Sequence, residues 1–286
     1  MRLLRAFFVS TLLITTLVAL CMKVVAAPGD FATIFYKSGN LQIEAYLYKP
    51  SGNGPFPIVI YNHGNYLGEQ RLERPSVEMG RLLTQAGFAV VVPERRGFGK
   101  SQGPTYNEDV DGPDRNGKQV RRAQSEADDV LAAVNYLKGD PSINMKKVAL
   151  MGYSLGGQVS VFAASRSDAF VALINQAGGS LGWNGNPLLQ QALVDAARKL
   201  RIPSLNMVAE NDATTEAVRR VSEAARASGT AAELIIYPPY FPPESMPEIA
   251  PSGFSTAPGH WIFRPAGLPI WEKDALAFLR RYLQEQ

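Results

Sequence analysis

The run Gly152-Tyr153-Ser154-Leu155-Gly156 has the residue types of a serine nucleophile held on a tight turn. An apolar run at 147–151 precedes it and a segment of small residues follows, which is the strand–turn–helix context that this motif requires. Glycine two positions from the serine on either side avoids collisions with neighbouring backbone. The hydroxyl would lie beside a helix N-terminus, which favours developing negative charge. We therefore expect Ser154 to be a nucleophile. The alternative is a tight turn with an incidental serine.

A serine hydroxyl is a weak nucleophile and needs a nearby base. The chain contains two histidines, so the choice is narrow. His63 follows the apolar run at 57–61, whereas His260 lies near the C-terminus, after the last expected strand. Hydrolases with a nucleophile of this kind have the chain order Ser, then Asp or Glu, then His. That order selects His260 as the general base.

The acid that orients the base should follow a strand between Ser154 and His260. The apolar run at 204–208 is such a strand, and Ala209-Glu210-Asn211-Asp212 follows it. We expect Asp212 to orient His260 and to stabilise its imidazolium form. Glu210 is the competing choice, because either acid can serve. Asp212 could also cap the helix expected at 215–227.

The elements that must position these residues are indicated by two kinds of hydrophobic pattern. Alternating apolar and polar residues at 32–36 and 41–48 predict an antiparallel strand pair. Short, nearly continuous apolar runs then alternate with helical patterns, as expected for strands buried on both faces of a parallel sheet. These strands are expected at 57–61, 88–92, 147–151, 170–174, 204–208 and 233–237, and the helices at 77–86, 122–137, 157–164, 188–200, 215–227 and 271–283.

This alternation predicts an α/β fold, with a doubly wound, mostly parallel sheet and helices on both faces. We expect one catalytic domain over 28–286, with a small cap or none. Two polar or proline-rich stretches interrupt the alternation, at 103–118 and at 238–258, and the second contains seven prolines. Long loops of this kind are often functional, so 238–258 could act as a lid or be a plain surface loop.

Residues 1–27 have the pattern of an export signal. Arg2 and Arg5 precede an uncharged, mostly apolar run at 6–20, and Val25-Ala26-Ala27 fits a signal-peptidase site. The apolar run is shorter than the roughly 20 residues that a membrane-spanning helix needs. We expect cleavage after Ala27 and a periplasmic or secreted protein. The alternative is a retained N-terminal membrane anchor.

Removal of this signal changes the interpretation of the charge and of the cysteine content. Loss of Arg2, Arg5 and Lys23 reduces the 29 basic residues to 26, equal to the number of acidic residues. No nucleic-acid-binding surface is therefore indicated. Cys21, the single cysteine, would leave with the signal, so neither a thiol nucleophile nor a disulfide is expected.

Neither a metal nor a nucleotide is expected as a cofactor. Two histidines far apart and no cysteine in the expected mature chain do not make a zinc site. Gly99-Lys100-Ser101 ends like a phosphate-binding loop, but Glu94 stands where that motif needs glycine. The acidic residues within 124–129 are expected to be solvated at the start of a helix, where they suit the helix dipole.

From residue 32 to its end, the chain resembles α/β-hydrolases of the dienelactone-hydrolase-like or prolyl-oligopeptidase-like branches. The resemblance is carried by His63-Gly64, the run Arg96-Gly97-Phe98-Gly99-Lys100-Ser101, the turn around Ser154, Asp212 and Gly259-His260, in that order. It implies that the backbone N–H groups of Asn65 and Leu155 bind the oxyanion. It also implies that His63 steadies its loop and does not act as a base.

Three features depart from that resemblance. Dienelactone hydrolases have a cysteine nucleophile, whereas this turn carries Ser154, so that activity is not implied. The separation between Asp212 and His260 is longer than is usual in that family, and the excess lies in 238–258. No propeller domain is expected before the catalytic one, which counts against a typical oligopeptidase.

Together, these patterns predict a serine hydrolase that cleaves carboxylic esters through an acyl-enzyme. An amidase or peptidase is the nearest alternative, and a binding protein that has kept the fold is a further one. We expect aromatic residues to line an apolar substrate pocket; they are Trp183, Tyr240, Phe241 and Phe254. The expected partner is a small ester or amide. The oligomeric state and the natural substrate do not follow from the sequence.

Overall fold

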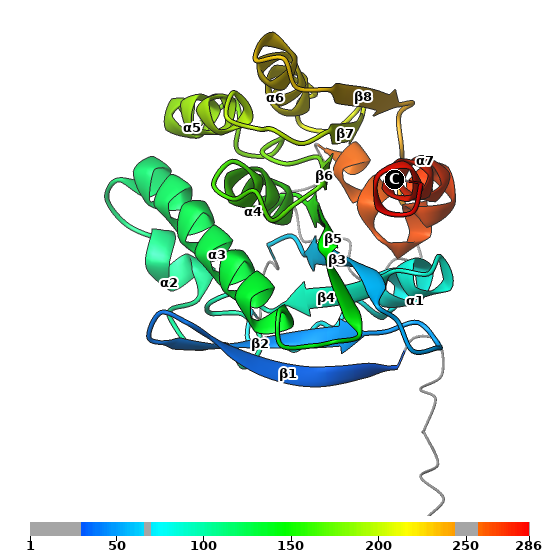
Figure 1. Ribbon diagram of the computed structural model, residues 1–286. Helices are drawn as coiled ribbons and strands as arrows, with labels where there is room; N and C mark the ends of the chain where they lie inside the picture. The colour runs from blue at the N-terminus through cyan, green and yellow to red at the C-terminus, as the bar shows by residue number, and fades with distance from the viewer. Residues whose placement is uncertain (1–29, 66–69, 244–256, 286) are drawn as a thin grey trace, which may run out of the picture.

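The computed structural model describes residues 30–65, 70–243 and 257–285. The predicted signal at 1–27 and most of the predicted loop at 238–258 lie outside these residues. The described strands form one sheet in the order β1-β2-β4-β3-β5-β6-β7-β8 (Figure 1). The strands are β1 (Phe31–Ser38), β2 (Leu41–Tyr48), β3 (Phe56–Asn62), β4 (Ala89–Pro93), β5 (Ile143–Tyr153), β6 (Ala172–Gln176), β7 (Ser204–Ala209) and β8 (Ala232–Tyr237).

The sheet is antiparallel at one edge and parallel across the rest. β1 pairs with β2 and β2 with β4 in antiparallel fashion, which confirms the predicted opening strand pair. All neighbouring strands from β4 to β8 pair in parallel. The parallel strands therefore end at one edge of the sheet, where open α/β proteins place their ligand sites.

Helices cover both faces of the sheet, as the apolar strands predict. Ile58 and Ile60 belong to the core under α3, α4, α5 and α6, whereas Val59 belongs to the core under α1 and α7 (Figure 1). All three side chains are completely buried. Successive strand residues alternate between faces, so an unbroken apolar run supplies both cores. The helices are α1 (Val77–Gln85), α2 (Tyr106–Val110), α3 (Arg115–Leu137), α4 (Leu155–Ala164), α5 (Pro187–Ala197), α6 (Glu216–Ala227) and α7 (Leu268–Leu283).

The stretch at 103–118, predicted to be a polar loop, is instead partly helical. It holds α2, whose N-terminus has a capping box between Thr105 and Glu108, and the first residues of α3. Helix α3 begins at Arg115 rather than at residue 122, because its first turn is polar and its first buried apolar side chain is Val120. Hydrophobic periodicity cannot locate a helix start that precedes the first apolar residue.

Only one helix, α5, lies between β6 and β7, so the structure has at most a small cap there. None of the helices in the described ranges combines the length and apolar character needed to cross a bilayer. Residue 260 lies on η1 (Pro258–Phe263), a 3₁₀-helix just before α7.

Candidate active site

Ser154 lies on a strained turn between the end of β5 and the start of α4. Its backbone has φ of 56° and ψ of −118°, which L-residues rarely adopt. Side chains could not be accommodated at the flanking glycines: a Cβ atom at Gly152 would lie 2.5 Å from Ser160 Oγ, and one at Gly156 would lie 2.5 Å from the His63 carbonyl oxygen. The predicted strand–turn–helix context is therefore present, and the glycines are required by the close approach of backbone.

His260 contacts Ser154 through one ring nitrogen and Asp212 through the other. Nε2 lies 2.9 Å from Ser154 Oγ, and Nδ1 lies 2.8 Å and 3.0 Å from the two oxygens of Asp212. The carboxylate can only accept, so Nδ1 carries the proton and Nε2 accepts from the hydroxyl. Both His260 and Asp212 are buried. The structure thus brings together the three side chains selected from the sequence.

Of the two acids that follow β7, the structure places Asp212 rather than Glu210 against His260. Glu210 is exposed, and its backbone N–H donates to the Tyr237 carbonyl. Asp212 is not the cap of α6, because that helix begins at Glu216 after Thr215. Asp212 Oδ1 instead accepts from the N–H of Ala213 at 2.6 Å.

Two residues that the sequence analysis did not select support this arrangement. The Tyr153 hydroxyl donates to the His260 carbonyl at 3.0 Å. The Asn211 side chain accepts from the N–H of Tyr240 and donates to the Tyr240 carbonyl, both at 2.9 Å, and the Asn211 carbonyl accepts from the N–H of Gly259. Asn211 therefore ties the loop that carries Asp212 to Tyr240 and to Gly259, the residue before His260. The only feature of the sequence that could have indicated Asn211 is its position directly before Asp212.

The segment His63-Gly64-Asn65 follows β3 and lies against the nucleophile turn. A Cβ atom on Gly64 would be 3.4 Å from the Cβ of Ser154. Asn65 follows at the edge of the site, where its side chain accepts from Gln70 at 3.1 Å. Leu155 is the first residue of α4, where backbone N–H groups lack partners within the helix. The roles of Asn65 and Leu155 as oxyanion donors stay predictions.

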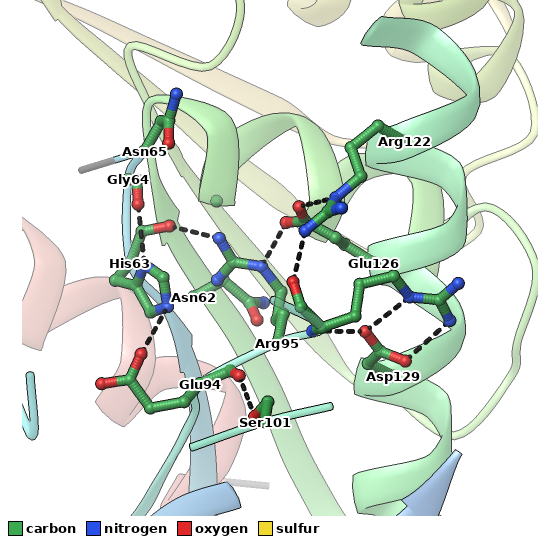
Figure 2. Close-up of polar contacts among 12 residues, drawn as sticks. Asn62, His63, Gly64, Asn65, Glu94, Arg95, Ser101, Arg122, Glu126 and Asp129 are labelled. Atoms are coloured by element: carbon green, nitrogen blue, oxygen red, sulfur yellow. Dashed lines mark hydrogen bonds and ion pairs between the residues drawn. The ribbon is translucent and has the colours of Figure 1, made fainter. Parts of the chain in front are cut away.

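His63 is buried and packed within the protein rather than turned towards Ser154. Its Nδ1 lies 2.7 Å from the Gly64 carbonyl and its Nε2 lies 3.4 Å from Glu94 Oε2 (Figure 2). Burial lowers the pKa of His63, the nearby Arg95 lowers it further, and Glu94 opposes both effects. The imidazole is thus kept neutral and holds its own loop, which agrees with the structural role that the resemblance implies.

Two of the acidic residues within 124–129, Glu126 and Asp129, contradict the prediction of a solvated helix start, whereas Asp128 is exposed as predicted. They lie in the middle of α3, and Glu126 and Asp129 are completely buried. Glu126 accepts from Arg95 Nε and from Arg122 Nε, each at 2.6 Å (Figure 2). Burial raises the pKa of Glu126, but Arg95 and Arg122 outweigh that effect and hold the pKa below its usual value. The prediction was wrong for these two residues because Arg95 and Arg96, which bind Glu126 and Asp129, lie on another segment, after β4.

Asp129, also on α3, binds Arg96, the residue that follows Arg95. Its two oxygens accept from Arg96 Nε at 3.0 Å, from Arg96 Nη2 at 2.8 Å and from the Arg96 backbone N–H at 2.9 Å (Figure 2). Bidentate arginine–carboxylate pairs are geometrically specific. Helix α3 therefore anchors the segment after β4 through two successive arginines.

A cavity of about 250 Å³ lies beside the nucleophile turn. Its lining includes Gly64 and Tyr153 together with Tyr61, Arg74 and Arg264.

The predicted aromatic pocket is not this cavity. Trp183 and Tyr240 are buried and Phe241 is 71% exposed, and none of them is among the residues that line it. Phe254 lies outside the described residues. Among the residues that the structure describes, no group of three or more His, Cys, Asp or Glu side chains could hold a metal ion.

This sheet, its helices and the turn around Ser154 are those of the α/β-hydrolase fold, and solved structures of that fold superpose on the chain. Acylaminoacyl peptidase from Pyrococcus horikoshii matches with a TM-score of 0.66 and 18% identity over 90% of this chain and 42% of its own. The esterase Pf2001 from Pyrococcus furiosus matches with a TM-score of 0.63 and 16% identity over 89% of this chain and 92% of its own. At such identities the likeness shows the fold alone.

The family follows from the sequence match. A sequence model of the dienelactone hydrolase family matches residues 43–240, and the chain belongs to that family. The quorum-quenching protein AidA of Acinetobacter baumannii is 27% identical over 63% of this chain and 54% of its own length. A Bacillus subtilis protein described as the uncharacterised peptidase YtmA is 27% identical over 54% of this chain and 50% of its own. The match thus spans about half the length of these curated relatives.

Proposed function

We propose that this protein is a serine hydrolase that cleaves carboxylic esters through an acyl-enzyme intermediate. The observation that carries the proposal is the continuous chain of contacts from Ser154 Oγ through His260 to the Asp212 carboxylate. A hydroxyl, an imidazole and a buried carboxylate in this order can remove a proton from the nucleophile and stabilise the imidazolium that results. Membership of the dienelactone hydrolase family agrees with it.

In the proposed first step, His260 Nε2 takes the proton of Ser154 as the serine oxygen attacks the ester carbonyl. The carbonyl oxygen becomes an oxyanion, which the backbone N–H groups of Leu155 and Asn65 bind. His260 then returns the proton to the departing alcohol as the tetrahedral intermediate collapses. Water attacks the acyl-enzyme by the same route, and the acid product leaves with Ser154 restored. Asp212 keeps the proton on Nδ1 throughout.

The proposed substrate class is a small, accessible ester. Among the described residues, the segment between β6 and β7 has one helix, α5, and so provides no large cap over the site. The adjacent cavity of about 250 Å³ is at or below the lower end of the range for drug-sized ligands, so it suits a modest acyl or alcohol group.

A panel of chromogenic esters of increasing acyl length, with matched anilides, tests this proposal. We expect turnover of the short esters, a loss of activity for long acyl chains, and loss of all turnover in Ser154→Ala. Faster cleavage of the anilides would favour an amidase or peptidase instead. A folded wild-type protein that hydrolyses neither series would favour a binding protein that has kept the fold.

We further propose that the protein is exported and cleaved after Ala27. The support is the sequence of the first 27 residues: a basic start, an uncharged apolar run and Val25-Ala26-Ala27 before Pro28. N-terminal sequencing of the protein recovered from the periplasm or medium checks this proposal. A mature chain that begins at Pro28 is expected, whereas an intact N-terminus in the membrane fraction would indicate an anchor.

A further inference from the structure

A buried arginine connects helix α3 with the segment that carries the expected oxyanion donor. Arg95 is completely buried, and its Nη2 donates to the His63 carbonyl at 2.8 Å. Its Nε donates to Glu126 at 2.6 Å. Figure 2 shows the guanidinium between the two, with the carbonyl on one side and the carboxylate on the other. The hydrogen bonds of Arg95 go to Glu126 and to the His63 carbonyl rather than to Ser154 or His260, so any effect on catalysis is indirect.

The orientation of the Arg95 guanidinium is fixed by Glu126 and Arg122. Glu126 binds Arg95 with one oxygen and Arg122 with the other, and all three side chains are at most 1% exposed. Arg122 in turn donates to the carbonyls of Arg96 and Pro104, so the carboxylate cannot rotate without breaking several contacts. Nε donates to Glu126, and the guanidinium is planar. The position of Nη2 is therefore fixed, and it donates to the His63 carbonyl.

The position of that carbonyl matters because the nucleophile turn lies against it. A Cβ on Gly156 would lie 2.5 Å from the His63 oxygen and would overlap the carbonyl of Asn62. The next residue, Gly64, lies against Ser154, and Asn65 follows. Arg95 therefore holds the peptide between His63 and Gly64, which directly precedes the peptide that carries the Asn65 N–H.

Ion pairing alone would not explain a buried cluster of this kind. Desolvation of a buried arginine and carboxylate costs about as much as their attraction returns, so such pairs are weak evidence of stabilisation. An oxyanion donor, by contrast, must lie about 2.7–3.1 Å from the developing charge, and a small displacement weakens it.

We propose that Arg95 is a positioning residue that places the Asn65 N–H for the oxyanion, with Glu126 fixing the guanidinium. This inference rests on the function proposed above. Arg95 moves no proton and touches no substrate. Its loss displaces a donor that acts on the transition states of both acylation and deacylation, so kcat falls while KM changes little.

The test compares an ester with the matched thionoester, in which sulfur replaces the carbonyl oxygen. Sulfur is a weak hydrogen-bond acceptor, so oxyanion donors accelerate the ester far more than the thionoester. The ratio of the two kcat/KM values therefore measures how well the oxyanion donors act. A loss of folded or active protein lowers both values equally and leaves the ratio unchanged. The variants are Arg95→Lys, which shortens the reach and removes the fork, and the near-isosteric Glu126→Gln.

Arg122→Lys is the matched control. It disturbs the same buried cluster and the same carboxylate, but Arg122 donates to the Arg96 and Pro104 carbonyls and not to His63. We expect Arg95→Lys to lower kcat for the ester about 10- to 100-fold, with KM within about twofold, and the ester-to-thionoester ratio to fall by a similar factor. Glu126→Gln should shift the ratio in the same direction by less. Arg122→Lys should lower the melting temperature and change the ratio far less than Arg95→Lys does, because Arg122 acts on the His63 carbonyl only through Glu126.

An unchanged ratio in either folded variant, Arg95→Lys or Glu126→Gln, would overturn the inference. An equal fall in Arg122→Lys would do so as well, because the effect would then follow stability. These outcomes are distinguishable from failure of the proposed function, in which the wild-type protein would show no turnover that depends on Ser154.

Discussion

The hydroxyl of Tyr153, the residue before the nucleophile, donates to the backbone carbonyl of His260 across a 3.0 Å hydrogen bond. The two rings also lie 5.1 Å apart. Burial raises the pKa of Tyr153 and the nearby Asp212 raises it further, against an opposing effect of Arg264, so the hydroxyl stays a donor in any ordinary assay. One side chain thereby connects the turn that holds Ser154 with η1, the 3₁₀-helix that holds the base.

Tyr153→Phe tests this connection, since it keeps the ring and removes the donor. The expected loss in unfolding free energy is about 1 kcal/mol, the typical contribution of one hydrogen bond. We also expect a fall in ester turnover of about tenfold, because His260 is less well held against Ser154. Turnover equal to that of the wild type in Tyr153→Phe would show that the bond contributes only to stability.

Asp212→Asn should lower turnover by about 10³- to 10⁴-fold without unfolding the protein. The amide cannot accept the Nδ1 proton as the carboxylate does, so His260 adopts the wrong tautomer. Glu210→Gln is the control, because Glu210 is an acid on the same loop but is exposed. It should leave turnover within about twofold of the wild type. Steady-state kinetics on one ester measure both variants, and a larger effect at Glu210 would reverse the assignment.

Gly156→Ala should destabilise the protein by about 3 kcal/mol or more, the upper range for an overpacked core. The added methyl group would overlap the Asn62 carbonyl, which belongs to the backbone and cannot turn aside. Gly185→Ala provides the comparison, because a Cβ there meets no atom within 4 Å. Urea denaturation of the two variants should show a large loss for the first and less than about 0.5 kcal/mol for the second. Similar stabilities would mean that the two segments can separate.

His63 should make stability depend on pH just below neutrality. Burial and Arg95 lower its pKa below the 6.5 of the unfolded chain, although Glu94 opposes them. Between the lowered pKa and 6.5 the unfolded state binds more protons, so the free energy of unfolding falls as pH falls through this window. The slope is at most about 1.4 kcal/mol per pH unit.

His63→Asn removes this titration and keeps a short side-chain amide. Urea denaturation at several values between pH 5 and 7.5 should therefore give a shallower dependence for the variant than for the wild type, because His260 and the carboxyl groups remain in both. Equal slopes in the two proteins would mean that His63 binds protons equally in the folded and unfolded states.

The alternation of short apolar runs with helical patterns was sufficient to predict the sheet, because strands buried on both faces have few polar residues. The site residues followed from equally local signals. Ser154 lies in a motif with required flanking elements, and the chain order left His260 as the base. The contacts of these residues in the structure agree with the choice, while their catalytic roles stay predictions.

What could not be predicted depends on partners far apart in the sequence. Glu126 was expected to face solvent, as isolated acids usually do. It is buried because Arg95, on the segment after β4, and Arg122, one turn earlier on α3, neutralise it. The Tyr153–His260 hydrogen bond likewise joins residues 107 positions apart. Arg122 lies only four residues from Glu126, but the Arg95–Glu126 and Tyr153–His260 pairings have no local pattern in the chain, so only the folded structure reveals them.

Labelling of the purified protein with a fluorophosphonate probe tests the central claim most directly, with Ser154→Ala and Asp212→Asn beside the wild type. Such probes react with activated serines and largely ignore ordinary hydroxyls. The account predicts rapid stoichiometric labelling of the wild type, much slower labelling of Asp212→Asn and none of Ser154→Ala. A folded wild-type protein that stays unlabelled, or label that persists in Ser154→Ala, would contradict the assignment of Ser154 as the nucleophile.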